Sequence, residues 1–314
     1  MALQAIVPQV LRIGTRDSTL ALVQARTVAA ALESAWPGLC CPIYPMTTTG
    51  DKFLSDRLSA IGDKGLFTKE LEDALYAEQI DVAIHSFKDL PGQLPPGLLW
   101  TSLLPRETPW DVLIDPQRRT LHALPSGTVL GTASIRRTAQ LQLARPDVVV
   151  QLVRGNVQTR MAKLNRGDVD VLLLAGAGLH RLNMRGLISQ TLLPEDGFVP
   201  APGQGILAAE YAAPWVKRML APLVHAPTQW AAEAEWGIVR ALEGGCSVPL
   251  GAHSWLTDAS GCVLDERAVA IPEDAQAHVW VTRFVEGARR PLVLRRQGLV
   301  SEDLGVADML ALWG

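Results

Sequence analysis

Two hydrophobic patterns alternate along the first ninety residues of the chain. Short β-branched runs typical of buried strands occupy residues 11–15, 41–48 and 81–86. Ala- and Leu-rich stretches typical of helices occupy residues 18–35, where Ser18 is the expected N-cap, and residues 68–77. This alternation predicts a largely parallel sheet with helices on both of its faces.

A second unit with the same alternation follows residues 104–109, where two prolines interrupt the chain. It has predicted strands at 128–132, 148–153 and 170–174, and predicted helices at 134–144 and 157–166. Pro194, Pro200 and Pro202 mark a second crossing, after which residues 205–211 are expected to return to the first sheet. Two crossings would form a hinge pair between two related α/β domains.

The C-terminal quarter of the chain has a different pattern. A long helix is predicted at 228–241, and three strand-like runs follow at 251–257, 262–271 and 277–285. We expect these runs to pair antiparallel because they are close in sequence, and we expect a helix after Asp303. The fold class is therefore α/β: domain 1 (1–104 with 205–222), domain 2 (109–200) and a smaller α+β domain 3 (226–314).

Composition narrows the classes of function. Hydrophobic residues make up 48% of the chain and charged residues 19%, which is typical of a globular protein. No apolar run is long enough to span a bilayer, and no signal-peptide pattern is present, so we expect a cytoplasmic protein without a membrane partner. The net charge of −3 gives no basic field for nucleic acid. The four cysteines lack metal-ligand spacing, so no metal site is expected.

Lys88 and Asp89 follow the predicted strand 81–86 and precede Pro91. Open α/β sheets bind their ligands at the carboxyl ends of strands, which makes this pair a candidate site. The alternative is a solvated surface pair, which would contribute little.

Arginines recur where a predicted strand gives way to a helix. Three such junctions combine guanidinium groups with hydroxyls or a glycine: Arg16 and Ser18; Thr132, Ser134, Arg136 and Arg137; Arg154, Gly155 and Arg160. Helix N-termini favour anions, and the guanidinium fork matches a carboxylate. Surface arginines are mostly solvated, but three junctions in two facing domains predict a polyanionic ligand. The absence of a Walker-type loop favours carboxylates over phosphates.

Cys246 stands directly after Gly244 and Gly245. A free cysteine is most often a small buried hydrophobe, and no His or Asn adjoins this one for protease-type activation. An exposed thiol in a glycine turn is instead a candidate covalent attachment point.

Eight motifs together resemble the porphobilinogen deaminase family, whose members are also called hydroxymethylbilane synthases. They are residues 14–18, 50–51, 64–67, 85–91, 131–137, 154–160, 202–205 and 242–246. The motifs occur in the family's order from residue 11 to about residue 251, and the combination is very specific. The resemblance implies two domains like those of type II periplasmic binding proteins and a third that carries a cofactor cysteine.

The family's chemistry gives each candidate residue an implied role. The family joins four porphobilinogen molecules head to tail with release of four ammonia, for haem and tetrapyrrole biosynthesis. Its primer is a dipyrromethane cofactor, bound by a thioether at the position of Cys246, and Asp89 is the implied catalytic residue. The implied cofactor-binding residues are Lys88, Thr132, Ser134, Arg136, Arg137, Arg154 and Gly155. The implied substrate-binding residues are Arg16, Ser18, Lys64, Arg160, Arg181 and Gln204. We expect a monomer.

Two residues depart from the family pattern. Trp110 and Trp236 stand where the family commonly has arginine, which puts local domain contacts and elongation in doubt. A catalytically impaired paralogue and a two-lobed polycarboxylate-binding protein are therefore alternative interpretations. The absence of a signal peptide and the presence of both Asp89 and Cys246 argue against the binding protein.

Overall fold

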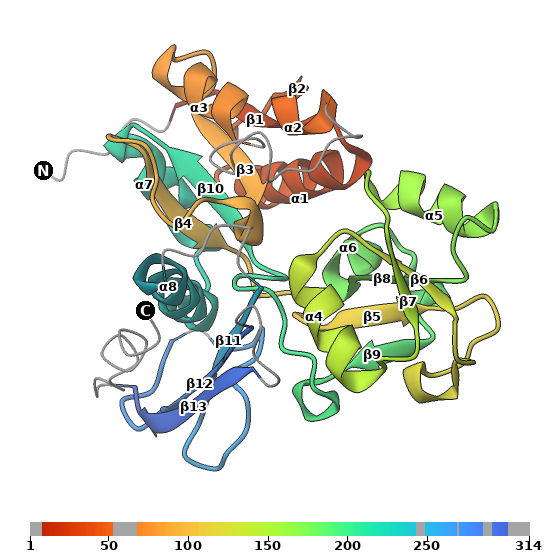
Figure 1. Cartoon of the computed structure of the whole chain (residues 1–314). Helices are drawn as coiled ribbons and strands as arrows, with labels where there is room; N and C mark the ends of the chain where they lie inside the picture. The colour runs from red at the N-terminus through yellow and green to blue at the C-terminus, as the bar shows by residue number, and fades with distance from the viewer. Residues whose placement is uncertain (1–7, 53–67, 243–248, 269, 285–290, 301–314) are drawn as a thin grey trace, which may run out of the picture.

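The computed structural model describes residues 8–52, 68–242, 249–268, 270–284 and 291–300. Its first sheet has five strands (Figure 1). Their order is β2 (Ile43–Met46), β1 (Ile13–Arg16), β3 (Val82–Ser86), β10 (Leu207–Tyr211) and β4 (Leu99–Leu103). β1 pairs parallel with β2 and β3, whereas β10 pairs antiparallel with β3 and β4. The predicted return of residues 205–211 to this sheet is confirmed.

The second sheet repeats this arrangement. Its order is β7 (Val149–Leu152), β6 (Val129–Thr132), β8 (Val171–Ala175), β5 (Asp111–Ile114) and β9 (Gln190–Leu192). β6 is parallel to β7 and β8, and β5 is antiparallel to β8 and β9. Both sheets are thus mixed and not largely parallel. The antiparallel strands β10 and β5 enter directly after the chain crosses from the other sheet, so no local strand–helix–strand connection sets their direction.

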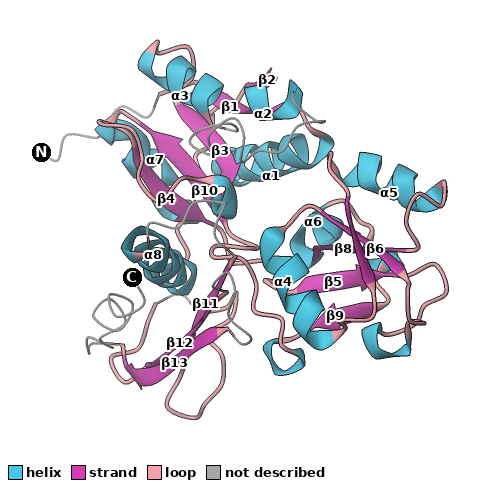
Figure 2. Ribbon diagram, in the orientation of Figure 1, coloured by secondary structure: helices cyan, strands magenta, loops and turns pink. Residues whose placement is uncertain are grey.

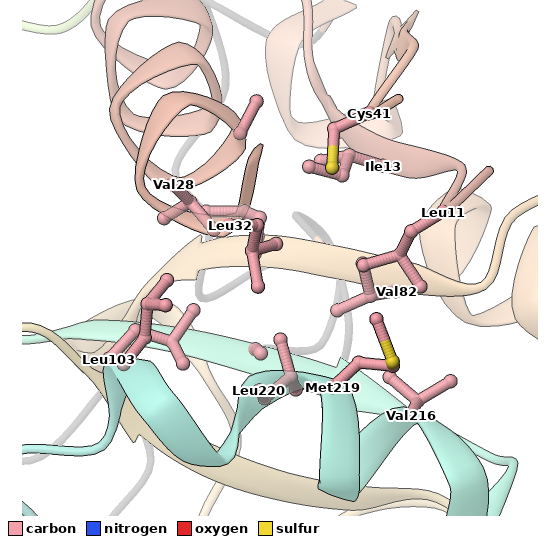
Figure 3. Close-up of a cluster of buried hydrophobic side chains, with 14 of the residues drawn as sticks. Leu11, Ile13, Val28, Leu32, Cys41, Val82, Leu103, Val216, Met219 and Leu220 are labelled. Carbon is pink, nitrogen blue, oxygen red and sulfur yellow. The ribbon is translucent and has the colours of Figure 1, made fainter. Parts of the chain in front are cut away.

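Helices cover both faces of each sheet (Figure 2). In the first unit α1 (Thr19–Ala35) and α7 (Pro214–Leu220) share one core, and α3 (Lys69–Tyr76) belongs to another; a short α2 (Thr49–Lys52) follows β2. Figure 3 shows Val28 and Leu32 of α1 with Met219 and Leu220 of α7 in the first core. In the second unit α4 (Ile135–Ala144) lies in one core, and α5 (Val157–Asn165) and α6 (Gly176–Arg181) in the other. The helices packed on both faces of each sheet confirm the α/β class.

The third part has one long helix, α8 (Ala226–Ala241), and a sheet in the order β11 (Leu250–Thr257), β12 (Gln276–Arg283), β13 (Leu292–Leu299). The strands are antiparallel as expected, but the predicted strand 262–271 is wrong. In that stretch only an isolated bridge from Val263 to Thr257 is found among the described residues. Asp258 accepts bonds from Ser260 N and Cys262 N and so forms a turn there. The predicted helix after Asp303 lies outside the described residues.

No helix in the described parts of the chain is long and apolar enough to cross a membrane.

Candidate active site

The Lys88–Asp89 pair lies at the carboxyl end of β3, as the sequence predicted. The strand ends at Ser86, and one 3₁₀ turn, Phe87–Asp89, follows it. Phe87 and Leu90 are buried on either side of the pair, and Phe87 N donates to Ile206 O (3.0 Å). The side chain of Asp89 keeps 35% of its surface exposed. The turn therefore directs a carboxylate and an ammonium group out of a well-packed strand end.

Cationic side chains from both α/β units gather around Asp89. Arg16, at the end of β1, lies 4.0 Å from its carboxylate (Nη1 to Oδ2). Burial and the charge of Arg137 lower the pKa of Arg160 on α5 to about 10, although Asp89 opposes the change. Burial is likewise the main reason that the pKa of Lys88 falls to about 8, with Asp89 opposing the fall and Arg137 adding to it. Lys88 and Arg160 come from different units, yet both lie within electrostatic reach of Asp89 and of Arg137.

Gln204, on the second crossing, connects this cluster to the first crossing. Its Nε2 donates to Pro109 O (2.6 Å) and to Asp111 Oδ1 (2.9 Å). Its Oε1 accepts from Lys88 Nζ (3.5 Å) and from Arg137 Nη2 (3.4 Å). The amide therefore presents its donor to the acidic side of the cluster and its acceptor to the basic side.

Asp111, at the start of β5, is a residue that the sequence reasoning missed. It is 1% exposed and binds both Arg136 (2.7 Å) and Arg137 (2.8 Å). Burial alone would raise the pKa of Asp111, but the two guanidinium groups outweigh it and hold that pKa well below its usual range. The sequence could have indicated Asp111, because an acidic residue stands there at the start of an apolar strand, two positions after Pro109 of the first crossing.

The second unit's predicted residues lie where strands end and helices begin. Ser134 caps α4 by accepting from Arg137 N, and Thr132 Oγ1 accepts from Ser134 N (3.2 Å). Gly155 has φ +110°, a conformation that favours glycine, and its carbonyl accepts from Arg160 Nε (2.7 Å). Arg154 is half-buried beside it. Of these residues, Arg160 lies within electrostatic reach of Asp89 in the other unit.

Two other predicted substrate-binding residues, Ser18 and Arg181, bond to backbone atoms. Ser18 caps α1 by accepting from Ala21 N (3.3 Å). Arg181 Nη2 donates to Gly205 O (2.7 Å) on the second crossing, and burial lowers the pKa of Arg181 to about 10. Lys64 and Cys246 lie outside the described residues.

Glu235 of α8 joins the crossings to the third part, and it too was missed. Its side chain is fully buried (0% exposed), and it binds Arg106 of the first crossing (2.6 and 3.1 Å). It also accepts from Gly203 N of the second crossing (2.5 Å) and from Ser254 N of β11 (2.7 Å). One carboxylate therefore holds three segments that meet beside the cluster.

The two tryptophans that replace arginine both lie at contacts of the third part. Trp110 packs edge-on against His253 of β11, with ring centroids 4.8 Å apart. Trp236 Nε1 donates to Pro91 O (3.0 Å). Both residues that depart from the family pattern therefore lie where the third part meets the rest of the chain.

Comparison with known proteins decides the family. The family model described as "Porphobilinogen deaminase, dipyromethane cofactor binding domain" matches residues 11–215. The chain belongs to the porphobilinogen deaminase family. A porphobilinogen deaminase of Syntrophobacter fumaroxidans is 45% identical over 80% of this chain and 81% of its own length. One of Moorella thermoacetica is 48% identical over 79% of this chain and 80% of its own length.

Solved structures give a much weaker likeness. The periplasmic aliphatic sulphonate binding protein SsuA from Escherichia coli is 14% identical, with a TM-score of 0.38 over 76% of this chain and 71% of its own. Membership of the deaminase family carries the functional conclusion instead. The chain is a hydroxymethylbilane synthase, a transferase of tetrapyrrole and porphyrin biosynthesis with a dipyrromethane cofactor. These predictions from the sequence are confirmed.

The residues of the site fit a dipyrromethane with its acetate and propionate groups. Six cations surround two carboxylates, Asp89 and Asp111; the cations are Arg16, Lys88, Arg136, Arg137, Arg154 and Arg160. Burial and, to a lesser degree, repulsion from Arg137 lower the pKa values of Lys88 and Arg160, so an anionic ligand would stabilise the charged forms of both groups. The buried Nε of Arg136 has no hydrogen-bond partner among the described residues.

Proposed function

We propose that this enzyme joins four porphobilinogen molecules head to tail, releases four ammonia molecules and forms hydroxymethylbilane, with its dipyrromethane primer bound through a thioether to Cys246. The observation that carries the proposal is the excess of cations that face Asp89 from both α/β units. Each added pyrrole brings an acetate and a propionate, so the growing chain is a polycarboxylate that such a site would bind.

We assign the carboxylates of the cofactor to seven residues of the cluster. They are Lys88, Thr132, Ser134, Arg136, Arg137, Arg154 and Gly155. Asp111 fixes the guanidinium groups of Arg136 and Arg137, so little side-chain entropy is lost when they bind a carboxylate. We assign the incoming substrate to Arg16, Ser18, Lys64, Arg160, Arg181 and Gln204. A hydrogen bond to a charged group contributes about 1.5–3 kcal/mol, so a few of them suffice to hold a flexible chain.

The cofactor, when bound, supplies the pyrrole to which the first substrate is joined. Asp89 assists proton transfer to the departing amine of porphobilinogen. Its carboxylate also stabilises the positive charge that develops on the pyrrole when ammonia leaves. Arg16, beside Asp89, holds a substrate carboxylate and so orients the substrate toward Asp89.

The covalent primer is tested by the intact mass of the denatured protein. We expect an excess equal to two deaminated porphobilinogen units, which is absent from a Cys246→Ser control. An unmodified wild-type mass that persists after incubation with porphobilinogen would contradict the proposal. Steady-state ammonia release would then separate an active enzyme from a paralogue that carries the primer without elongating it.

Cofactor assembly is expected to slow above pH 8 because Lys88 loses its charge there. Free lysine titrates near 10.5, but the pKa of Lys88 is about 8, so its ammonium group is present at pH 7 and mostly neutral at pH 9. Lys88→Arg keeps a cation at both values, since arginine stays protonated. The measurement is the rate at which cofactor-free protein gains the primer from porphobilinogen at pH 7 and pH 9.

The wild-type rate should fall between these pH values by a factor several times larger than the Lys88→Arg rate. Lys217→Arg, an exposed change on α7, is the matched control and should behave as wild type. Equal pH dependence in wild type and Lys88→Arg would remove Lys88 from primer binding.

The oligomeric state and the compartment stay predictions from the sequence. Size-exclusion chromatography of the loaded enzyme would test the expected monomer, and cell fractionation would test the cytoplasmic location.

A further inference from the structure

The segment that carries Asp89 lies against α8. Figure 1 shows α8 between the first sheet and the strands β11–β13, and it contacts both β4 and β11. At Gly92 the backbone comes so close that an added Cβ would lie 3.0 Å from Val239 Cγ1 of α8. α8 ends at Ala241, and Cys246 follows five positions later in the sequence. One helix therefore supports the Asp89 segment and leads into the cofactor cysteine.

Trp236 of α8 is linked to both ends of this segment, directly at one end and through a second tryptophan at the other. At the C-terminal end its Nε1 donates to Pro91 O (3.0 Å). At the N-terminal end the contact runs through Trp100 of β4, whose ring lies 5.4 Å from the Trp236 ring and 4.6 Å from that of Phe87. Phe87, Leu90, Trp100 and Trp236 belong to one apolar cluster.

The position of Asp89 is fixed more by the backbone on either side of it than by the contacts of the Asp89 side chain. Its ion pair with Arg16 is long, at 4.0 Å, and its side chain is partly exposed. The backbone around it is held by Phe87 N bonding to Ile206 O and by the indole bond at Pro91 O. An error of about 1 Å in the position of a reacting group can cost about a hundredfold in rate.

We propose that Trp236 is a positioning residue for Asp89, because its indole fixes residues 87–91 on the helix that precedes the cofactor cysteine. This inference rests on the proposed role of Asp89. The contacts of Trp236 are with Pro91 O and the ring of Trp100 and not with the residues assigned to substrate, so we expect it to act on turnover and to leave substrate affinity unchanged.

Two variants of the loaded, full-length enzyme separate the hydrogen bond from the ring. Trp236→Phe keeps an aromatic ring beside Trp100 but removes the donor to Pro91 O. Trp236→Arg removes the ring and restores N–H donors, as in the arginine common at this position of the family. Trp280→Phe is the matched control, because Trp280 Nε1 has no hydrogen-bond partner among the described residues.

The measurements are steady-state kcat and KM for porphobilinogen, single-turnover ammonia release, and intact mass to establish cofactor loading. We expect Trp236→Phe to keep the primer and a KM within about twofold of wild type, while kcat and the single-turnover rate fall about tenfold. Trp236→Arg should recover to within about threefold of wild type, and Trp280→Phe should not change.

An unchanged kcat in Trp236→Phe would overturn the proposal. So would a loss of activity that tracks missing primer mass, or an equal loss in Trp280→Phe, because either result is what a merely structural role predicts. A wild-type enzyme that releases no ammonia would overturn the proposed function, and this inference with it. The two failures are distinguishable because only the second affects wild type.

Discussion

Asp89→Ala is expected to lower turnover about a thousandfold or more in a protein that stays folded. General acid–base catalysis by one side chain contributes about 10²- to 10⁴-fold, and Asp89 also faces the positive charge that develops as ammonia leaves. Folding should survive because the Asp89 side chain is 35% exposed and its ion pair with Arg16 is long. Steady-state ammonia release and thermal melting of the loaded enzyme are the two measurements.

Two further variants sharpen the result. Asp89→Asn keeps the shape of the side chain without its charge and should be nearly as slow as Asp89→Ala. Asp168→Ala is the control. It removes an exposed carboxylate that pairs with Arg166 (2.8 Å) and is not assigned to the site, so turnover should not change. Near-normal turnover in Asp89→Ala would exclude Asp89 from the mechanism.

Glu235→Ala is expected to reduce the free energy of unfolding by about 3–5 kcal/mol, since it leaves one partner of a buried ion pair uncompensated. Arg106 would lose its carboxylate, and the amides of Gly203 and Ser254 would lose their acceptor. Because these partners belong to both crossings and to β11, the third part should also separate from the other two at lower urea concentration. Equilibrium urea unfolding followed by tryptophan fluorescence measures the change.

Glu233→Ala is the matched control on the same helix. Its carboxylate is exposed and accepts one bond from Gln229 (2.7 Å), so its loss should cost less than about 1 kcal/mol. Glu235→Gln should fall between the two, because it keeps the shape and one acceptor but leaves the charge of Arg106 unmatched. Equal unfolding curves for Glu235→Ala and Glu233→Ala would contradict the role of Glu235 in holding the two crossings and β11 together.

Much of the fold follows from local sequence. Ser18 caps α1 as expected, and Ser134 caps α4 in the same way, because capping depends on one side chain and the next few backbone amides. The apolar runs locate β3 and β8 for a similarly local reason, since both strands are buried on both faces. The same local reasoning failed for one strand, which was predicted at 262–271. The third strand of the last sheet is β13, in which Arg295, Arg296 and Gln297 are exposed, so its hydrophobic pattern is weak.

The sequence by itself determined the kinds of group at the site. An anionic ligand was indicated by the arginines and hydroxyls at the strand–helix junctions. Lys88 and Asp89 at a strand end marked a candidate site in the same way. Only the tertiary structure decided which charges form buried ion pairs within the protein. Asp111 pairs with Arg136 and Arg137, and Glu235 pairs with Arg106, which is 129 positions away in the sequence. The physical reason is range. Helix capping and hydrophobic periodicity act over a few residues, whereas the partner of a buried charge is set by segments that meet only when the chain has folded.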